Sequence, residues 1–160
     1  MGLFDIFKKK DMPIGSPLKG KCVSIKDVSD PTFADEILGK GIAIIPEDGR
    51  VYAPADGQIT TIFPTGHAVG MTTEGGVELL IHVGIDTVSL QGEGFKIIAK
   101  DGQTVKKGDL LLDVDLEKVR KAGYDIITPV IVCNTGEFAE INTYIGKSMN
   151  IGDTIMEIKK

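Results

Sequence analysis

The sequence predicts an all-β fold, an antiparallel sandwich or barrel with a few short helices. Twenty glycines and seven prolines separate short runs that are rich in β-branched residues. This rhythm of short strands between turn residues is typical of all-β domains. The clearest runs are Gly41 to Ile45, Gln58 to Phe63, Val77 to Ile85, Leu110 to Val114 and Pro129 to Val132.

Helical signals are few and short. Asp30 before Pro31 reads as an N-cap and first helical position, with the helix ending near Gly39. A second short helix is predicted from Asp115 to Gly123 and a single turn within 135–141. We therefore expect the helices to lie at the edges of the predicted sheets and not to form the core.

Internal repetition is the second observation that favours this fold. Residues 16–23 (SPLKGKCV) are echoed by 53–60 (APADGQIT), and 107–111 (KGDLL) by 151–155 (IGDTI). A third echo joins 41–44 (GIAI) to 66–69 (GHAV). Together the echoes predict two intertwined copies of one β motif and an approximate two-fold symmetry.

Composition narrows the function classes. The chain has 160 residues, 42% of them hydrophobic, and a formal net charge of -5, which indicates a folded, mildly acidic protein. Nucleic acid is excluded as a partner because phosphate backbones require a basic face. A partner with a basic patch fits better. Cys22 and Cys133 stand alone, so we expect a reducing, cytoplasmic setting.

The N-terminal segment differs in pattern from the rest. On a helical wheel Leu3, Phe4, Ile6 and Phe7 share one side and three lysines follow, which predicts a weak contact with the inner membrane surface. A frayed terminus remains the alternative. We therefore divide the chain into a flexible amphipathic segment, 1–14, and one domain, 15–160.

Any imidazole chemistry must use the chain's only two histidines, His67 and His82. His82 lies in a strand whose unbroken aliphatic face is Leu79, Ile81, Val83 and Ile85. Because successive side chains alternate between faces, His82 is predicted on the opposite face with Leu80, Gly84 and Asp86. His67 follows Thr65 and Gly66 in another β-like run. From the pattern alone, a hydrogen-bonded structural histidine remains the alternative.

The segments Gly76 to Val88 and Gly92 to Phe95 closely resemble the glucose-type enzyme IIA proteins of the phosphoenolpyruvate-dependent sugar phosphotransferase system. The likeness covers nearly the whole chain and includes Ala53 to Gly57, Thr65 to Ala68 and Gly102 to Asp109. It implies a barrel-sandwich hybrid with a duplicated hybrid motif. It also implies a phosphotransferase component that accepts a phosphoryl group from the phosphocarrier HPr and gives it to a cysteine on the IIB domain of a sugar permease.

The resemblance also assigns roles to residues. His82 would be the phosphohistidine and nucleophile, His67 would stabilise the phosphoryl group, and Thr65 would orient His67. Attack through one ring nitrogen requires the other to keep its proton on a fixed acceptor, and the Gly84 carbonyl is our candidate for His82. The partner-binding surface would comprise Asp30, Phe33, Ile37, Leu38, Phe63, Leu80, Asp86 and Val88.

Two other functions match part of the sequence pattern. A biotinyl or lipoyl carrier domain shares the Ala-Pro-x-x-Gly and Gly-Asp signals, but no lysine stands at a hairpin tip between characteristic neighbours. A zinc peptidase of related fold needs three protein ligands and an open position, and the chain supplies two histidines. We expect no required cofactor, with His67 and His82 able to bind zinc only where a partner completes the shell.

Overall fold

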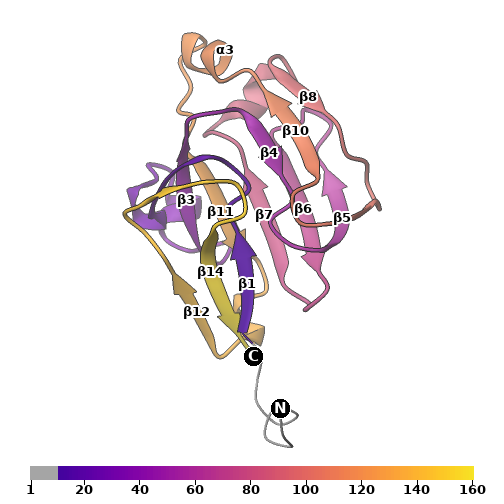
Figure 1. Ribbon diagram of the computed structural model, residues 1–160. Helices are drawn as coiled ribbons and strands as arrows, with labels where there is room; N and C mark the ends of the chain where they lie inside the picture. The colour runs from indigo at the N-terminus through magenta and orange to yellow at the C-terminus, as the bar shows by residue number, and fades with distance from the viewer. Residues whose placement is uncertain (1–10) are drawn as a thin grey trace, which may run out of the picture.

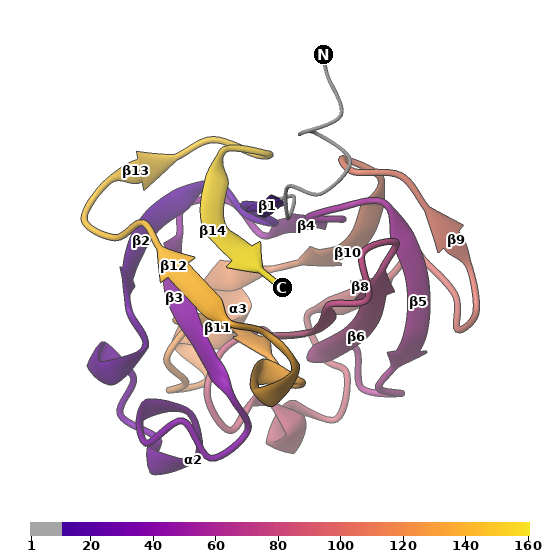
Figure 2. The same cartoon turned by 90° about the horizontal axis from the view of Figure 1, so that it is seen from below.

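In the computed structural model, which describes residues 11–160, antiparallel strands are arranged in three sheets. Figure 2 shows the strands surrounding a common interior, with α2 on the outside beside β3. This arrangement confirms the predicted all-β barrel-sandwich. The strands, in order along the chain, are β1 (Asp11–Gly15), β2 (Gly20–Ser24), β3 (Lys40–Pro46), β4 (Arg50–Tyr52), β5 (Gly57–Ile62), β6 (Ala68–Thr73), β7 (Glu78–His82), β8 (Phe95–Ile97), β9 (Thr104–Val105), β10 (Leu110–Val114), β11 (Thr128–Val132), β12 (Glu140–Thr143), β13 (Ser148–Met149) and β14 (Thr154–Lys159).

The largest sheet has the order β13-β2-β3-β11-β7-β6-β5-β9, and the two smaller sheets have the orders β1-β14-β12 and β4-β10-β8. The helical elements are short: η1 (Ile25–Asp27), α2 (Pro31–Ala34), η2 (Thr87–Leu90), α3 (Leu116–Lys121) and η3 (Thr135–Glu137). Asp30 caps α2 as predicted, and Asp115 caps α3, each accepting a backbone N–H. Helix α2 ends at Ala34, well before Gly39, because its C-terminal continuation forms turns.

Strand β1 belongs to the folded domain, which therefore includes residues that the sequence pattern places before it. Its residues pair with β14, Asp11 opposite Lys159 and Ile14 opposite Met156, and the two strands lie side by side in Figure 1. Ile14 is 1% exposed. Residues 11–14, which the sequence pattern places in the N-terminal segment, thus pair with the C-terminal strand of the folded domain. The rest of the predicted amphipathic segment, 1–10, lies outside the described residues.

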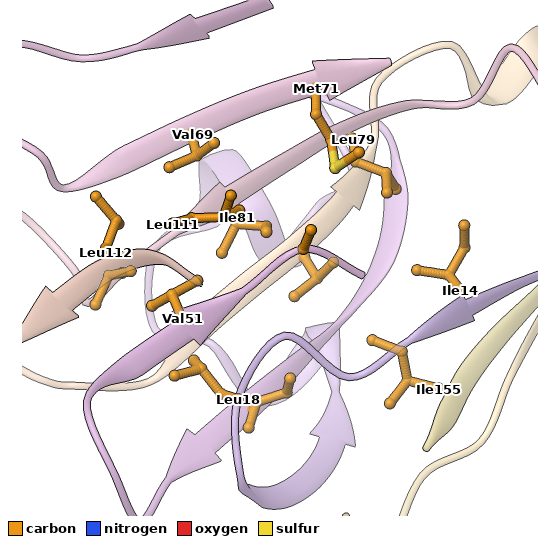
Figure 3. Packing of buried hydrophobic residues seen from close by; sticks show 14 of the residues in the cluster. Ile14, Leu18, Val51, Val69, Met71, Leu79, Ile81, Leu111, Leu112 and Ile155 are labelled. Atoms are coloured by element: carbon orange, nitrogen blue, oxygen red, sulfur yellow. The ribbon is translucent and has the colours of Figure 1, made fainter. Parts of the chain in front are cut away.

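The core lies between the sheets. Val69 and Met71 of β6 and Leu79 and Ile81 of β7 face Leu111 and its neighbours from β10 and β4 (Figure 3). Each of these side chains is at most 2% exposed. Their burial fixes which face of β7 points inward, and so places His82 on the outer face.

The duplication predicted from the first two echoes is visible in the hydrogen bonds. The Ser16 N–H donates to the Asp153 carbonyl at 2.7 Å, and the Ala53 N–H donates to the Asp109 carbonyl at 2.8 Å. These are corresponding residues of the two repeated segments. Two copies therefore interlock, each contributing a strand pair to the large sheet: β2 and β3 from the first, β5 and β6 from the second.

The third echo is wrong in its register. Cys22 pairs with Ile44 in the first copy, and its counterpart Ile59 pairs with Met71 in the second. Ile44 therefore corresponds to Met71 and not to Val69, as the echo required. Gly and Ala recur by chance where strands approach closely, so a four-residue match in such segments carries little register information.

Candidate functional site

His82 is the last residue of β7, on the outer face of the large sheet. Leu79 and Ile81 are buried in the core at 2% and 0% exposure, whereas Leu80 and His82 are half-buried on the other face. The predicted alternation is therefore confirmed through Val83, but Ile85, expected on the same core face, belongs to the outer cluster with Phe33 because the strand ends at His82. The strand ends here because Gly84 adopts a positive φ of 77°, a conformation that favours glycine.

A backbone carbonyl fixes the tautomer of the His82 ring. The Nδ1 atom lies 2.7 Å from the Gly84 carbonyl oxygen. Because a carbonyl can only accept a hydrogen bond, Nδ1 carries the proton and Nε2 carries the lone pair. The residue expected from sequence to hold His82 thus lies where that role requires.

His67 lies against His82 although strand alternation alone would separate them. In the register of β6 and β7, Ala68 stands opposite His82, which would send His67 to the other face. However, β6 begins only at Ala68, and Gly66 before it has a φ of 74° that turns the chain. The two ring centroids are 5.1 Å apart at an interplanar angle of 80°.

The turn that carries His67 is held from two sides. The Thr65 hydroxyl is hydrogen-bonded to His67 Nδ1. A Cβ atom on Gly66 would lie 3.0 Å from Phe95 Cβ and 3.1 Å from Ile97 Cγ1, so only glycine lets the turn pack this closely on β8. The Gly92 to Phe95 segment thus supports the histidine turn, and Ile97 is a supporting residue that the sequence analysis missed.

Burial keeps both imidazoles neutral near pH 7. His67 is 4% exposed, and burial, aided by the positive charge that His82 can carry, lowers the pKa of His67 to about 4. Burial also lowers the pKa of His82, although the hydrogen bond to Gly84 and the carboxylates of Asp30 and Asp86 oppose that shift. The pair therefore offers a neutral nucleophile beside a neutral hydrogen-bonding ring.

Two phenylalanines flank the histidine pair. The Phe33 ring centroid lies 4.9 Å from that of His82, and the Phe63 ring meets His67 edge-on at 5.2 Å. Phe63 is 40% exposed, but Phe33 is only 4% exposed. The structure therefore corrects the expected role of Phe33: it backs the His82 ring and presents little surface to a partner.

The other residues expected at the partner surface fall into two groups. Ile37, Leu38 and Val88 are exposed apolar side chains, at 69%, 39% and 52%. Leu80 is half-buried against a small outer cluster that includes Phe33. Of the acids, Asp30 caps α2 through Thr32 N–H, and Asp86 is exposed with a positive φ of 60°. Both carboxylates act on the pKa of His82.

Thr87 was also missed. It is fully buried, and its hydroxyl donates to the Val83 carbonyl at 2.6 Å, directly after His82. No periodicity or spacing rule marks such a residue, because its contact depends on the turn that follows β7.

The histidine pair offers ring nitrogen atoms to a metal ion. Within residues 11–160, no group of three or more His, Cys, Asp or Glu side chains could hold a metal ion. Both Nδ1 atoms already have hydrogen-bond partners, which leaves two Nε2 atoms. Cys22 is buried and Cys133 is exposed, and both are free.

Comparison with known proteins identifies the family. Residues 12–138 match a family model described as phosphoenolpyruvate-dependent sugar phosphotransferase system, EIIA 1. The chain belongs to this EIIA family. It is thus a phosphotransferase component of the sugar phosphotransferase system, and the biotinyl-carrier and peptidase alternatives are not favoured.

Relatives and a solved structure agree with the family assignment. The chain is 47% identical over 141 residues to the "PTS system glucose-specific EIIA component" of Halalkalibacterium halodurans, covering 88% of this chain and 82% of the relative. A solved structure of the glucose permease IIA from Mycoplasma capricolum superposes with a TM-score of 0.88 at 36% identity, covering 98% of this chain and 99% of that one.

A further relative places an EIIA segment within a much longer protein. The "PTS system glucosamine-specific EIICBA component" of Bacillus subtilis is 54% identical over 121 residues, which are 76% of this chain but only 19% of that relative. By its name, that relative carries an EIIA component in one chain with EIIC and EIIB components. Of the residues described here, none form a helix long and apolar enough to cross a membrane.

Proposed function

We propose that Nε2 of His82 accepts a phosphoryl group from HPr and passes it to a cysteine on the IIB domain of a sugar permease. The observation that carries this proposal is the hydrogen bond from His82 Nδ1 to the Gly84 carbonyl. It leaves Nε2 as the nucleophilic atom of a neutral, half-exposed ring.

Acceptance requires the lone pair of Nε2. As the N–P bond to His82 forms, the bond from phosphorus to the donor breaks. In the second transfer the thiolate of the IIB cysteine forms an S–P bond as the N–P bond breaks, which returns the lone pair to Nε2 of His82. Phosphoryl transfer passes through a loose, in-line transition state, so positioning and charge stabilisation contribute most of the catalysis. The lowered pKa of His82 supports this role because a protonated ring has no lone pair to offer.

His67 serves the phosphoryl group in this proposal. If the Thr65 hydroxyl donates to Nδ1 of His67, the proton of His67 resides on Nε2, from which it can be donated to a phosphoryl oxygen. The contact between the two rings supports this geometry. Burial keeps His67 from accepting a second proton in the free protein, so its donor stays a neutral N–H.

Docking would use the exposed apolar side chains around the pair, Ile37, Leu38, Phe63 and Val88, with Asp30 and Asp86 meeting basic residues of HPr. A shared apolar surface with a charged rim suits a protein that must meet a donor and an acceptor in turn. The relatives whose names join EIIC, EIIB and EIIA support a sugar permease as one partner.

Two finer expectations complete the proposal. Zinc would bind at most at a partner interface, since two Nε2 atoms supply half of a tetrahedral shell and the partner must supply the rest. The protein would act in the cytoplasm, with residues 1–10 offering a weak contact to the inner membrane surface.

The test is reconstitution with phosphoenolpyruvate, enzyme I and HPr, followed by mapping of acid-labile phosphate. The expected result is one phosphoryl group on the wild-type protein and none on His82→Ala. Labelling of His82→Ala at the wild-type level would contradict the proposal.

A further inference from the structure

We propose that Thr87 is a positioning residue for phosphoryl transfer: its hydroxyl holds the chain after His82 so that the Gly84 carbonyl stays on His82 Nδ1. This inference rests on the proposed function, because it concerns the atom that selects Nε2 as the nucleophile. Thr87 touches no substrate atom in the proposal and acts only through the backbone.

Three successive peptide groups after His82 are each pinned by a hydrogen bond. The Val83 N–H donates to the His67 carbonyl at 2.7 Å, and the Ile85 N–H donates to the Asp125 carbonyl at 3.0 Å. Between them, the Val83 carbonyl accepts the Thr87 hydroxyl at 2.6 Å. Thr87 supplies the only side chain among these three hydrogen bonds. Its bond to the Val83 carbonyl is therefore the one that a side-chain substitution can remove.

These three hydrogen bonds restrain the backbone conformation of Gly84. It has the conformational freedom of glycine at a φ of 77°, and its carbonyl must point at a ring nitrogen two residues back. A Cβ atom on Gly84 would lie 2.5 Å from Thr87 Cγ2 and 2.8 Å from the Asp125 carbonyl oxygen. Thr87 therefore restrains Gly84 in two ways: its hydroxyl binds the Val83 carbonyl, and its methyl group packs against Gly84.

Because Thr87 is buried, its hydroxyl is not readily replaced as the donor to the Val83 carbonyl. Thr87 is 0% exposed, so water cannot readily replace the bond to Val83. A valine fits the same volume but leaves the Val83 carbonyl without this donor. The neighbouring peptide can then rotate to find another partner, and the Gly84 carbonyl moves with it.

The duplicated fold supplies a matched control. Thr135 donates to the Val132 carbonyl at 2.6 Å and also accepts the Lys40 N–H at 2.9 Å. By the register of the two copies, Val132 corresponds to Val83. No histidine stands before it, since the residue there is Ile131. Thr135→Val thus removes the corresponding hydrogen bond from a hydroxyl to the backbone, together with the bond from Lys40 N–H, in a setting without an imidazole.

The experiment compares Thr87→Val with Thr135→Val in the full chain. The rate of phosphorylation by phosphoenolpyruvate, enzyme I and HPr is measured, with the ring ¹⁵N shifts of His82 and the thermal midpoint. We expect Thr87→Val to slow phosphorylation by about 10- to 100-fold, as displacement of an oriented group does, and to mix the two His82 tautomers. Thr135→Val lowers the midpoint at least as far but keeps the wild-type rate and a single Nδ1–H tautomer.

Thr87→Ser and Thr87→Ala provide the same comparison if the valine variant does not fold. Serine keeps the hydroxyl and is expected to retain most of the rate, whereas alanine loses it. Equal rates and tautomers for Thr87→Val and Thr135→Val would overturn the inference, as would a lost rate with the Nδ1–H tautomer intact. A wild-type protein that is not phosphorylated on His82 contradicts the proposed function instead, and the ¹⁵N shifts still decide the positioning role.

Discussion

The two copies of the β motif have the same backbone fold but carry side chains of different chemistry. In the second copy, His67 and His82 meet at the sheet surface. By register, the corresponding residues of the first copy are Lys40 and Ile131, and Ile131 is 0% exposed. The same strand positions thus hold a reactive pair in one copy and a core residue in the other. The scaffold supplies the positions, and the side chains supply the function.

The connections between paired strands explain the difference in exposure. In the first copy, residues 25–39 link β2 to β3 and contribute Ile25, Val28 and Phe33 to a cluster that covers Ile131. In the second copy, residues 63–67 link β5 to β6 directly. The long connection therefore buries the outer face of its own copy and places Phe33 against the His82 ring, which also contacts His67.

Substitution of His67 tests the reactive copy with the largest expected effect. His67→Ala should still accept phosphate from HPr, because Nε2 of His82 is unchanged. Onward transfer to the IIB cysteine should fall by about 10²- to 10³-fold, the usual cost of losing one donor to transition-state charge. Single-turnover transfer from the phosphorylated variant measures this. Transfer at the wild-type rate would remove His67 from its assigned role.

The depressed pKa of His67 predicts an acid-sensitive fold. The unfolded chain takes up a proton near the ordinary histidine pKa of 6.5, whereas folded His67 does so only at about 4. Folding stability should therefore fall as pH drops from 6.5 to 4, by up to about 3 kcal/mol from this residue. Urea unfolding across that range, compared with His67→Gln, measures the share due to His67. Parallel pH profiles for the two proteins would refute it.

Ile131 tests the unreactive copy. Ile131→Val should cost about 1 kcal/mol of unfolding free energy, as deletion of one buried methylene does. Phosphorylation of His82 should be unchanged because the lost group belongs to the covered face. Chemical denaturation and the phosphorylation rate of the same sample check both statements. A slowed rate at unchanged temperature would show that the two copies are coupled.

Asp30 gives the smallest and most selective effect. Asp30→Asn keeps an N-cap for α2, since Asn and Asp cap equally well, so stability should change little. Loss of the charge should slow phosphorylation by HPr by a few-fold at low salt, about the effect of one rim charge on association, and the difference should vanish at high salt. A salt-independent loss would point to the cap instead of the charge.

Local patterns predicted much of this molecule. Alternation placed His82 on the outer face of β7, and tautomer chemistry required a fixed acceptor for its ring proton, a role for which the nearby Gly84 carbonyl was the candidate and which it fills. The cap at Asp30 and the short helix after Asp115 were equally local. These features depend on residues close in the chain, where strand geometry and hydrogen-bond valence leave few choices.

Features that depend on long-range packing were missed. Phe33 was predicted to face a partner, but its burial depends on how 25–39 folds over β3 and β11. Thr87 acts through the turn after β7, and His67 reaches His82 only because it precedes β6, which starts at Ala68, and follows the turn at Gly66. None of these contacts leaves a periodic trace in the sequence.

Identification of the phosphorylated atom tests the central claim most directly. Wild-type protein with ¹⁵N-labelled histidine is phosphorylated through HPr, and the ³¹P–¹⁵N couplings of the product assign the ring nitrogen. Because Nδ1 of His82 donates to Gly84, we predict a single phosphoryl group on Nε2 of His82. Phosphate on Nδ1 of His82 or on His67 would contradict the account.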